Sequence, residues 1–138
     1  MPDLSVNYLA VLVAAVATWL IGALWYSPLL LGKAWMQANG YTPEKLQQMQ
    51  ATAARAYAVS FVCYLVMAYV VAVLAHHVQV GSAMGGARLG VLCWLGFAAT
   101  IGLTANLFSE KPLMAFVIDA GYQLVYLVAM GAIIGWWQ

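Results

Sequence analysis

Residues 113–136 read LMAFVIDAGYQLVYLVAMGAIIGW, an apolar stretch that contains one charged side chain, Asp119. A helix needs about 20 residues to cross the hydrocarbon of a bilayer, so this stretch is long enough to span it. Three further apolar stretches precede it, at residues 4–26, 56–76 and 87–107. Four spans use almost the whole chain, which predicts an all-α membrane protein folded as one domain, residues 1–138.

The composition supports the membrane class and excludes several functions. Of the 138 residues, 66% are apolar and 7% are charged, whereas soluble proteins have about 25% charged residues. A net charge of +1 provides no basic surface, so we expect the lipid bilayer and not nucleic acid as the partner. Cys63 and Cys93 lack the CxxC spacing of a metal or redox site. Adjacent His76 and His77 point about 100° apart on a helix, so we expect no metal and no cofactor.

The basic residues predict how the chain is oriented. Lys33, Lys45 and Arg55 lie in the first connection and Lys111 in the third, against only Arg88 on the other side. The positive-inside rule places these two connections in the cytoplasm and both termini outside. No basic residue precedes the first span, so we interpret it as a retained helix and not a signal peptide. We expect a multi-pass protein of the bacterial cytoplasmic (inner) membrane.

The first connection is the only long polar segment. Ser27-Pro28 is a helix-start signal, and the apolar face that follows stops at Asn39-Gly40, which predicts a short helix lying in the membrane interface. Thr42-Pro43 repeats the start signal, and no helix breaker follows before Ala75, so we expect the second span to project several turns from the membrane. The second connection contains three glycines and is expected to be a flexible loop: Gly81, Gly85 and Gly86.

Asp119 is the only acidic residue in the interior of a span. A charged group at the bilayer centre costs about 2.5–3.5 kcal/mol on insertion scales, so intramembrane acids usually face a bundle interior or a wet cavity. Helical rise places Asp119 roughly 10 Å from the inner boundary, level with Trp19 and with residues 60–64 and 102–104. Its carboxyl is expected to be either hydrogen-bonded or protonated. The candidate ligand- or ion-binding residues are Asp119, Tyr122, Gln123, Tyr126, Ser60, Tyr64, Thr104 and Asn106.

The same residues allow a structural interpretation of the site. Tyr122, Gln123 and Tyr126 share one stripe of the fourth span with Asp119, and hydroxyl or amide donors from other spans could reach its carboxyl. Asp119 would then be a hydrogen-bonded packing residue between helices. The sequence leaves this alternative open beside a role in ligand or proton binding.

Glycines predict close helix packing on a second face of the fourth span. Gly131 and Gly135 have the small-xxx-small spacing that lets two helices approach closely, and Gly22 extends a row of small residues on the first span. The Gly131/Gly135 face could serve an internal contact or a subunit contact. We expect a homo-oligomer in which this face is the contact between subunits.

The run GALWYSPLL at residues 22–30, with Gly32-Lys33 and Trp35, resembles the signature of a bacterial membrane family catalogued as domain of unknown function 1761. The resemblance extends to Trp94 with Gly96-Phe97 and to Gly121-Tyr122 with Gly135-Trp136. It implies a small four-span membrane protein and supplies no catalytic residue. Leu31 stands where this family often has Phe, a difference without functional meaning.

Three function classes fit these features. The polar stripe around Asp119 favours a homo-oligomeric transporter or channel for a small solute, an ion or a proton. A membrane enzyme acting on a lipophilic substrate would need an acid/base pair or a metal set, so we assign no catalytic residue. A non-catalytic accessory protein would use the exposed residues 44–50 as its partner surface. We expect the first class, with an unidentified small-solute or lipophilic ligand.

Overall fold

The computed structural model describes residues 6–137, and these residues form helices joined by short connections, with no strand among them. Four helical segments are long and apolar enough to cross a membrane: α1, α4, the continuous α5–η1–α6 segment and α7. The predicted four-span, all-α fold is therefore confirmed. In chain order the helices are α1 Tyr8–Trp25, α2 Gly32–Asn39, α3 Pro43–Ala51, α4 Ala53–His77, α5 Ala83–Cys93, the π-helix η1 Trp94–Ala98, α6 Ala99–Phe108 and α7 Leu113–Trp136.

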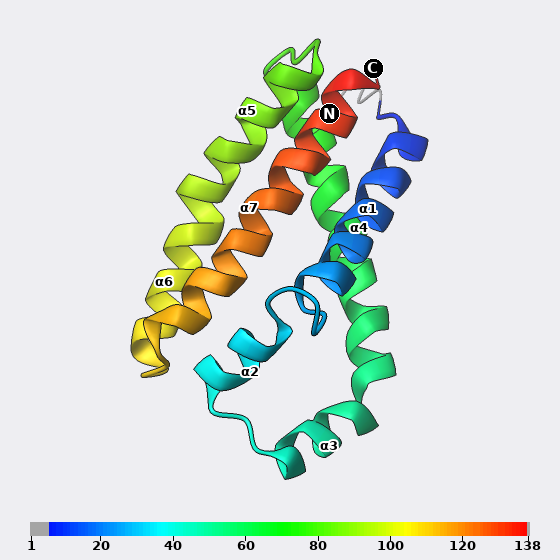
Figure 1. The fold of residues 1–138 in the computed structure, drawn as a ribbon. Helices are drawn as coiled ribbons and strands as arrows, with labels where there is room; N and C mark the ends of the chain where they lie inside the picture. The colour runs from blue at the N-terminus through cyan, green and yellow to red at the C-terminus, as the bar shows by residue number, and fades with distance from the viewer. Residues whose placement is uncertain (1–5, 138) are drawn as a thin grey trace.

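Helix α7 lies at the centre of the bundle, between α5 on one side and α1 and α4 on the other (Figure 1). The start of α1, the end of α7 and the α4–α5 loop lie at one end of the bundle, here called the terminal end. Helices α2 and α3 and the α6–α7 turn lie at the opposite end, here called the connection end. The buried residues of α7 follow its whole length: Ala115, Ile118, Ala120, Tyr122, Tyr126, Leu127, Met130, Gly131, Ile134 and Gly135.

At the terminal end, α5 and α7 are in backbone contact. A Cβ atom at Gly86 would collide with the carbonyl of Gly131, and a Cβ at Gly131 would collide with the carbonyl of Gly86. One turn away, a Cβ at Gly90 would meet the Leu127 carbonyl. Only glycine permits this approach, because every other residue carries a Cβ.

Two expectations about these glycines are therefore wrong. Gly85 and Gly86 do not belong to a flexible loop, since α5 begins at Ala83 and the Ser82 side chain caps it by accepting from the backbone N–H of Gly85. The Gly131/Gly135 face is not free to form a subunit contact, because α5 of the same chain covers it. The glycines of α5 and α7 are therefore needed for packing between two helices of the same chain.

The first connection folds differently from its sequence signals at the Ser27-Pro28 pair. The hydroxyl of Ser27 donates to the carbonyl of Leu24 at 2.6 Å, so Ser27 closes α1 and does not start the next helix. Helix α2 begins at Gly32, which is buried and where a Cβ would collide with the carbonyls of Tyr26 and Ser27. The end at Asn39 is as expected, since Gly40 adopts the left-handed conformation (φ 67°) that glycine permits.

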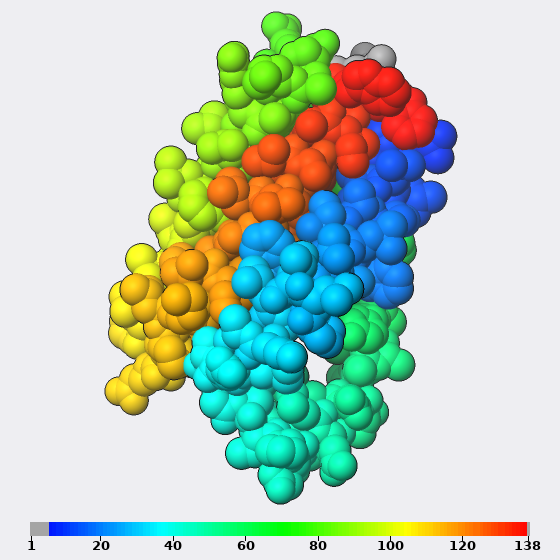
Figure 2. Space-filling view, in the orientation of Figure 1, coloured from blue at the N-terminus to red at the C-terminus, as the bar shows by residue number. Residues whose placement is uncertain are grey.

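The second span does not continue the helix that begins at Thr42-Pro43. The start is as expected, because the side chain of Thr42 accepts from the backbone N–H of Lys45 at 3.2 Å. Helix α3 nevertheless ends at Ala51, and α4 begins at Ala53 after Thr52 leaves the helical conformation (φ −113°, ψ 8°). No residue of α3 is buried, so no tertiary packing holds α3 in line with α4. Figure 2 shows α3 projecting from the connection end.

Candidate functional site

Asp119 lies where the end of α1 meets α7. The hydroxyl of Tyr26, the residue that caps α1, donates to the Asp119 carboxylate oxygen Oδ1 at 2.6 Å. Beside it, the indole N–H of Trp25 donates to the carbonyl of Ile118 at 3.1 Å. A short hydrogen bond to a carboxylate is among the stronger ones in proteins, so this pair fastens α1 to α7 at the acid.

The partner of Asp119 differs from those that helical rise suggested. Trp19 was expected at the level of Asp119, whereas Tyr26, seven residues further along, reaches it. Tyr26 looked like an interfacial aromatic anchor, since tyrosines at span ends usually are. Helical rise gives the depth of a residue along its own helix, measured from the expected membrane boundary. Because the helices cross one another at an angle, residues of equal depth on two helices need not lie side by side. The only signal for Tyr26 was its place in the Trp25-Tyr26-Ser27-Pro28 run.

Three of the expected tyrosines gather into one cluster next to this pair. The hydroxyl of Tyr122 donates to the carbonyl of Thr18 at 2.8 Å and lies 3.2 Å from the hydroxyl of Tyr64. The ring of Tyr126 lies 4.8 Å from that of Tyr122 and 5.6 Å from that of Tyr64, between centroids. Tyr26 joins the cluster through its ring, 5.4 Å from Tyr122. Tyr122 and Tyr126 thus lie together on the stripe of the fourth span, but none of the three hydroxyls forms a hydrogen bond with Asp119.

Gly22 provides the space that the cluster needs. A Cβ at this position would lie 2.6 Å from the hydroxyl oxygen of Tyr122, well inside contact distance. The absent side chain therefore lets Tyr122 cross over α1 and reach the carbonyl of Thr18. Gly22 therefore takes part in the contact between α1 and α7, where its neighbour is the side chain of Tyr122 and not a helix backbone.

Two other candidates lie apart from the acid. The hydroxyl of Thr104 donates to the carbonyl of Thr100 in its own helix at 2.8 Å, and Thr104 is exposed. Ser60 on α4 is half-buried and does not line the cavity beside Asp119. Asn106 and Gln123 do line that cavity.

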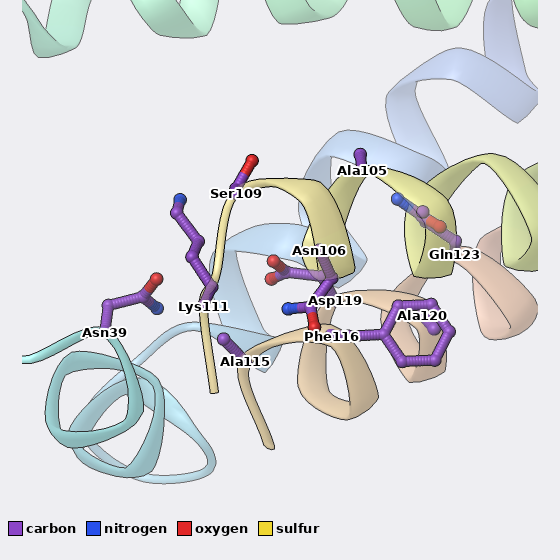
Figure 3. Close-up of a pocket in the computed structure, with 11 residues that line it drawn as sticks. Asn39, Ala105, Asn106, Ser109, Lys111, Ala115, Phe116, Asp119, Ala120 and Gln123 are labelled. Atoms are coloured by element: carbon purple, nitrogen blue, oxygen red, sulfur yellow. The ribbon is translucent and has the colours of Figure 1, made fainter. Parts of the chain in front are cut away.

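The cavity opens at the connection end and has a volume of about 190 Å³ (Figure 3). Residues from α2, α6, the α6–α7 turn and α7 surround it, and all of them except Asn39 lie within residues 102–123. A space of this size, with polar groups in its wall, is large enough for several water molecules. Its lining residues are Asn39, Gly102, Ala105, Asn106, Ser109, Lys111, Ala115, Phe116, Asp119, Ala120 and Gln123.

Hydrogen bonds orient the polar groups that line the cavity. The amide nitrogen of Asn106 donates to the carbonyl of Pro112 at 3.1 Å, and that of Asn39 donates to the carbonyl of Trp35 at 2.8 Å. Among the hydrogen bonds of residues 6–137, the Oδ1 atoms of both amides and the Oδ2 atom of Asp119 have no protein donor. Lys111 lies at the same cavity, and no ion pair forms within the described part of the chain. The side chains of Gln123 and Ser109 also line the cavity and form no hydrogen bond within these residues, so the site offers several free oxygen acceptors, amide and hydroxyl donors, and one ammonium donor.

Comparison with known proteins adds the family. No curated protein and no solved structure matches this chain. The family described as protein of unknown function (DUF1761) matches residues 9–135, a range that includes the four spans except Tyr8 and Trp136, the first connection and every residue lining the cavity. The resemblance noted in the sequence is thus confirmed, and the chain belongs to this family of proteins of unknown function, DUF1761.

Proposed function

We propose that this protein is a membrane carrier that loads a small polar solute or an ion at the cavity beside Asp119. The observation that supports the proposal is the free Oδ2 atom of Asp119 in the wall of a cavity that polar and apolar residues line together. Tyr26 donates to the other carboxylate oxygen, so the carboxylate is held in one orientation while Oδ2 stays available to a ligand. A carboxylate placed within a membrane span is expensive, and such groups commonly serve ion, proton or substrate pathways.

A carrier fits the packing better than an open pore through one chain. Beyond the cavity, the bundle is closed by Ala14, Ala68 and Met130, each with no exposed surface (0%). A second cavity of about 270 Å³ lies at the terminal end between α1, α4 and α7, lined in part by Asn7, His76 and Trp137. A bundle that is closed between its two ends suits alternating access, in which a solute reaches one side at a time.

The orientation and assembly remain proposals. The four basic residues near the connection end support a cytoplasmic position for it, and therefore loading from the cytoplasm of a bacterial inner membrane. If the chain forms a homo-oligomer, the α5–η1–α6 segment offers the contact, because it buries the least of the four spans. Large apolar side chains exposed on that segment are Leu92, Leu95, Phe97 and Ile101.

An accessory role is the second candidate, and one observation favours it. Helix α3 buries none of its residues and carries exposed charged and amide side chains, which suits a surface for a soluble partner. This role does not need the cavity beside Asp119. The two candidates therefore differ in what removal of the Asp119 charge should do.

The test is transport by proteoliposomes that contain the wild type, Asp119→Asn or Glu44→Gln. Proton movement under a potassium diffusion potential is read from an internal pH-sensitive dye, and sodium, potassium and a mixture of amino acids are tested by currents on a solid-supported membrane. We expect Asp119→Asn to reduce transport at least about tenfold, which corresponds to about 1.4 kcal/mol. Glu44→Gln, which changes an exposed acid of α3, should transport like the wild type.

Two results would reject the carrier. One is equal transport by the wild type and Asp119→Asn. The other is no transport above empty liposomes by any form of the protein. Either result would leave the accessory role as the better interpretation.

A further inference from the structure

The cavity beside Asp119 carries two opposite charges that do not neutralise each other. Asp119 lies in α7, and Lys111 lies two residues before that helix begins. The turn that carries Lys111 is held in place, because its backbone N–H donates to the carbonyl of Asn106 at 3.2 Å. No ion pair between the two side chains forms within residues 6–137. Both charges therefore remain free to bind groups of a ligand.

The acceptors around Asp119 match an ammonium group. An ammonium has three N–H donors, and among the described residues the cavity offers side-chain oxygens without a protein donor on Asp119, Asn106, Asn39, Gln123 and Ser109. The carbonyls of Pro112 and Trp35 fix which way the two asparagine amides face, because each carbonyl must receive the amide nitrogen. The carboxylate supplies the charge, and the amide oxygens can accept the remaining N–H groups.

Lys111 argues against a ligand that carries a positive charge alone. A lone cation would be attracted by Asp119 and repelled by the Lys111 ammonium, and a lone anion would meet the reverse. A ligand with both charges satisfies both groups and adds no net charge to a site at a membrane span. The lining also includes the apolar side chains of Ala105, Ala115 and Phe116, which suit a short carbon linker.

We propose that the ligand of this cavity is a small zwitterion, with its ammonium at Asp119 and its acidic group at Lys111. The inference names the ligand class of the proposed carrier, and only its transport role rests on that proposed function. A free amino acid and the ethanolamine headgroup of a phospholipid share this chemistry. The experiment below separates these two sources.

The first measurement compares ligands of matched shape by calorimetry on the whole protein in nanodiscs of phosphatidylglycerol, which has no ammonium group. Glycine, β-alanine and γ-aminobutyrate vary the distance between the charges, and propylamine and propionate each remove one charge from β-alanine. We expect at least one zwitterion to bind ten times or more tightly than both singly charged ligands. Equal or weaker binding by all three zwitterions overturns the proposal.

The second measurement assigns each charge to a residue. Asp119→Asn should lower zwitterion and propylamine binding and leave propionate as the preferred ligand. Lys111→Met should do the reverse, leaving propylamine preferred, and Lys111 is exposed, so this variant should fold. Glu44→Gln serves as the control and should keep the wild-type order. Loss of binding that is equal for all ligands in both variants overturns the assignment.

The third measurement identifies the source of the zwitterion. If the ligand is a lipid headgroup, phosphatidylethanolamine in the nanodisc should compete with β-alanine and phosphoethanolamine should bind well. If it is a free solute, changing the lipid should leave the affinity for β-alanine unchanged. Zwitterion binding without transport would reject the carrier and support the zwitterion site. Transport that depends on Asp119 but shows no preference for zwitterions would support the carrier and reject the zwitterion site.

Discussion

Helix α7 packs in opposite ways at its two ends. At the terminal end, Gly131 lies in backbone contact with Gly86 of α5. At the connection end, the side chain of Phe116 stands between α7 and Gly102 of α6, and a cavity of about 190 Å³ remains beside Asp119. A crossing without side chains leaves no room for a solute, whereas one spaced by large side chains leaves room that polar groups can line.

A π-helix separates these two modes of packing on the third span. It covers Trp94–Ala98, directly after the glycine contact of α5 and before α6. The indole N–H of Trp94 donates to the carbonyl of Ala120 at 2.8 Å, which anchors the wider turn to α7 next to Asp119. Such π-bulges often occur near functional sites. The tight end therefore brings two backbones into contact, and the spaced end leaves the cavity beside Asp119.

The largest expected effect comes from breaking the tight end. Gly131→Leu puts a side chain into the carbonyl of Gly86, so we expect destabilisation of about 3 kcal/mol or more, or failure to fold. Thermal unfolding in detergent measures it. Gly96→Ala is the control, because nothing lies within 4 Å of a Cβ built there. An unchanged melting temperature for Gly131→Leu would mean that the backbone contact is not required.

A smaller effect is expected from Tyr26→Phe at the spaced end. This change removes the hydroxyl that donates to Asp119 Oδ1 and leaves the ring in place, so we expect a loss of about 1.5–3 kcal/mol, as for hydrogen bonds to charged groups. Tyr57→Phe is the matched control, since Tyr57 is 61% exposed. Equal stability of the two variants would argue against the Tyr26–Asp119 contact.

Asp119→Asn should change stability less, because the amide oxygen can still accept from Tyr26. We expect a change within about 1 kcal/mol, the usual net value of a hydrogen bond. Asp119→Leu leaves the hydroxyl of Tyr26 without this acceptor and should cost more than the Asn variant. If both variants unfold at the same temperature as the wild type, the acid does not hold the two helices together.

The smallest structural effect is expected from a label on α3. Gln48 is exposed, so Gln48→Cys should leave stability unchanged in a background with Cys63 and Cys93 replaced by Ala. A membrane-impermeant thiol reagent should label it only in inverted vesicles, because the basic residues predict a cytoplasmic connection end. Gly81→Cys, at the terminal end, should label only in intact cells. The opposite pattern would reverse the orientation.

Much of the fold was predictable from local features. The fourth span, residues 113–136, agrees with α7 at both ends, because a long apolar run next to Pro112 leaves few alternatives. The first span was expected to start at residue 4, which lies outside the described residues, and α1 begins at Tyr8. The break at Thr52 and the start of α2 were less predictable. Both lie in short polar segments, where the presence or absence of tertiary packing decides where a helix begins and ends.

The sequence by itself determined that this is a four-span membrane protein and that Asp119 is the residue that costs most free energy to place in the bilayer. Length, apolar content and an isolated charge can all be read from the local sequence. Only the tertiary structure decided that Tyr26 is the partner of that acid and that Lys111 shares its cavity. It also decided that Gly131 packs inside the bundle and not between subunits. Helical spacing defines the faces of one helix, but which faces meet depends on crossing angles and offsets that involve the whole bundle.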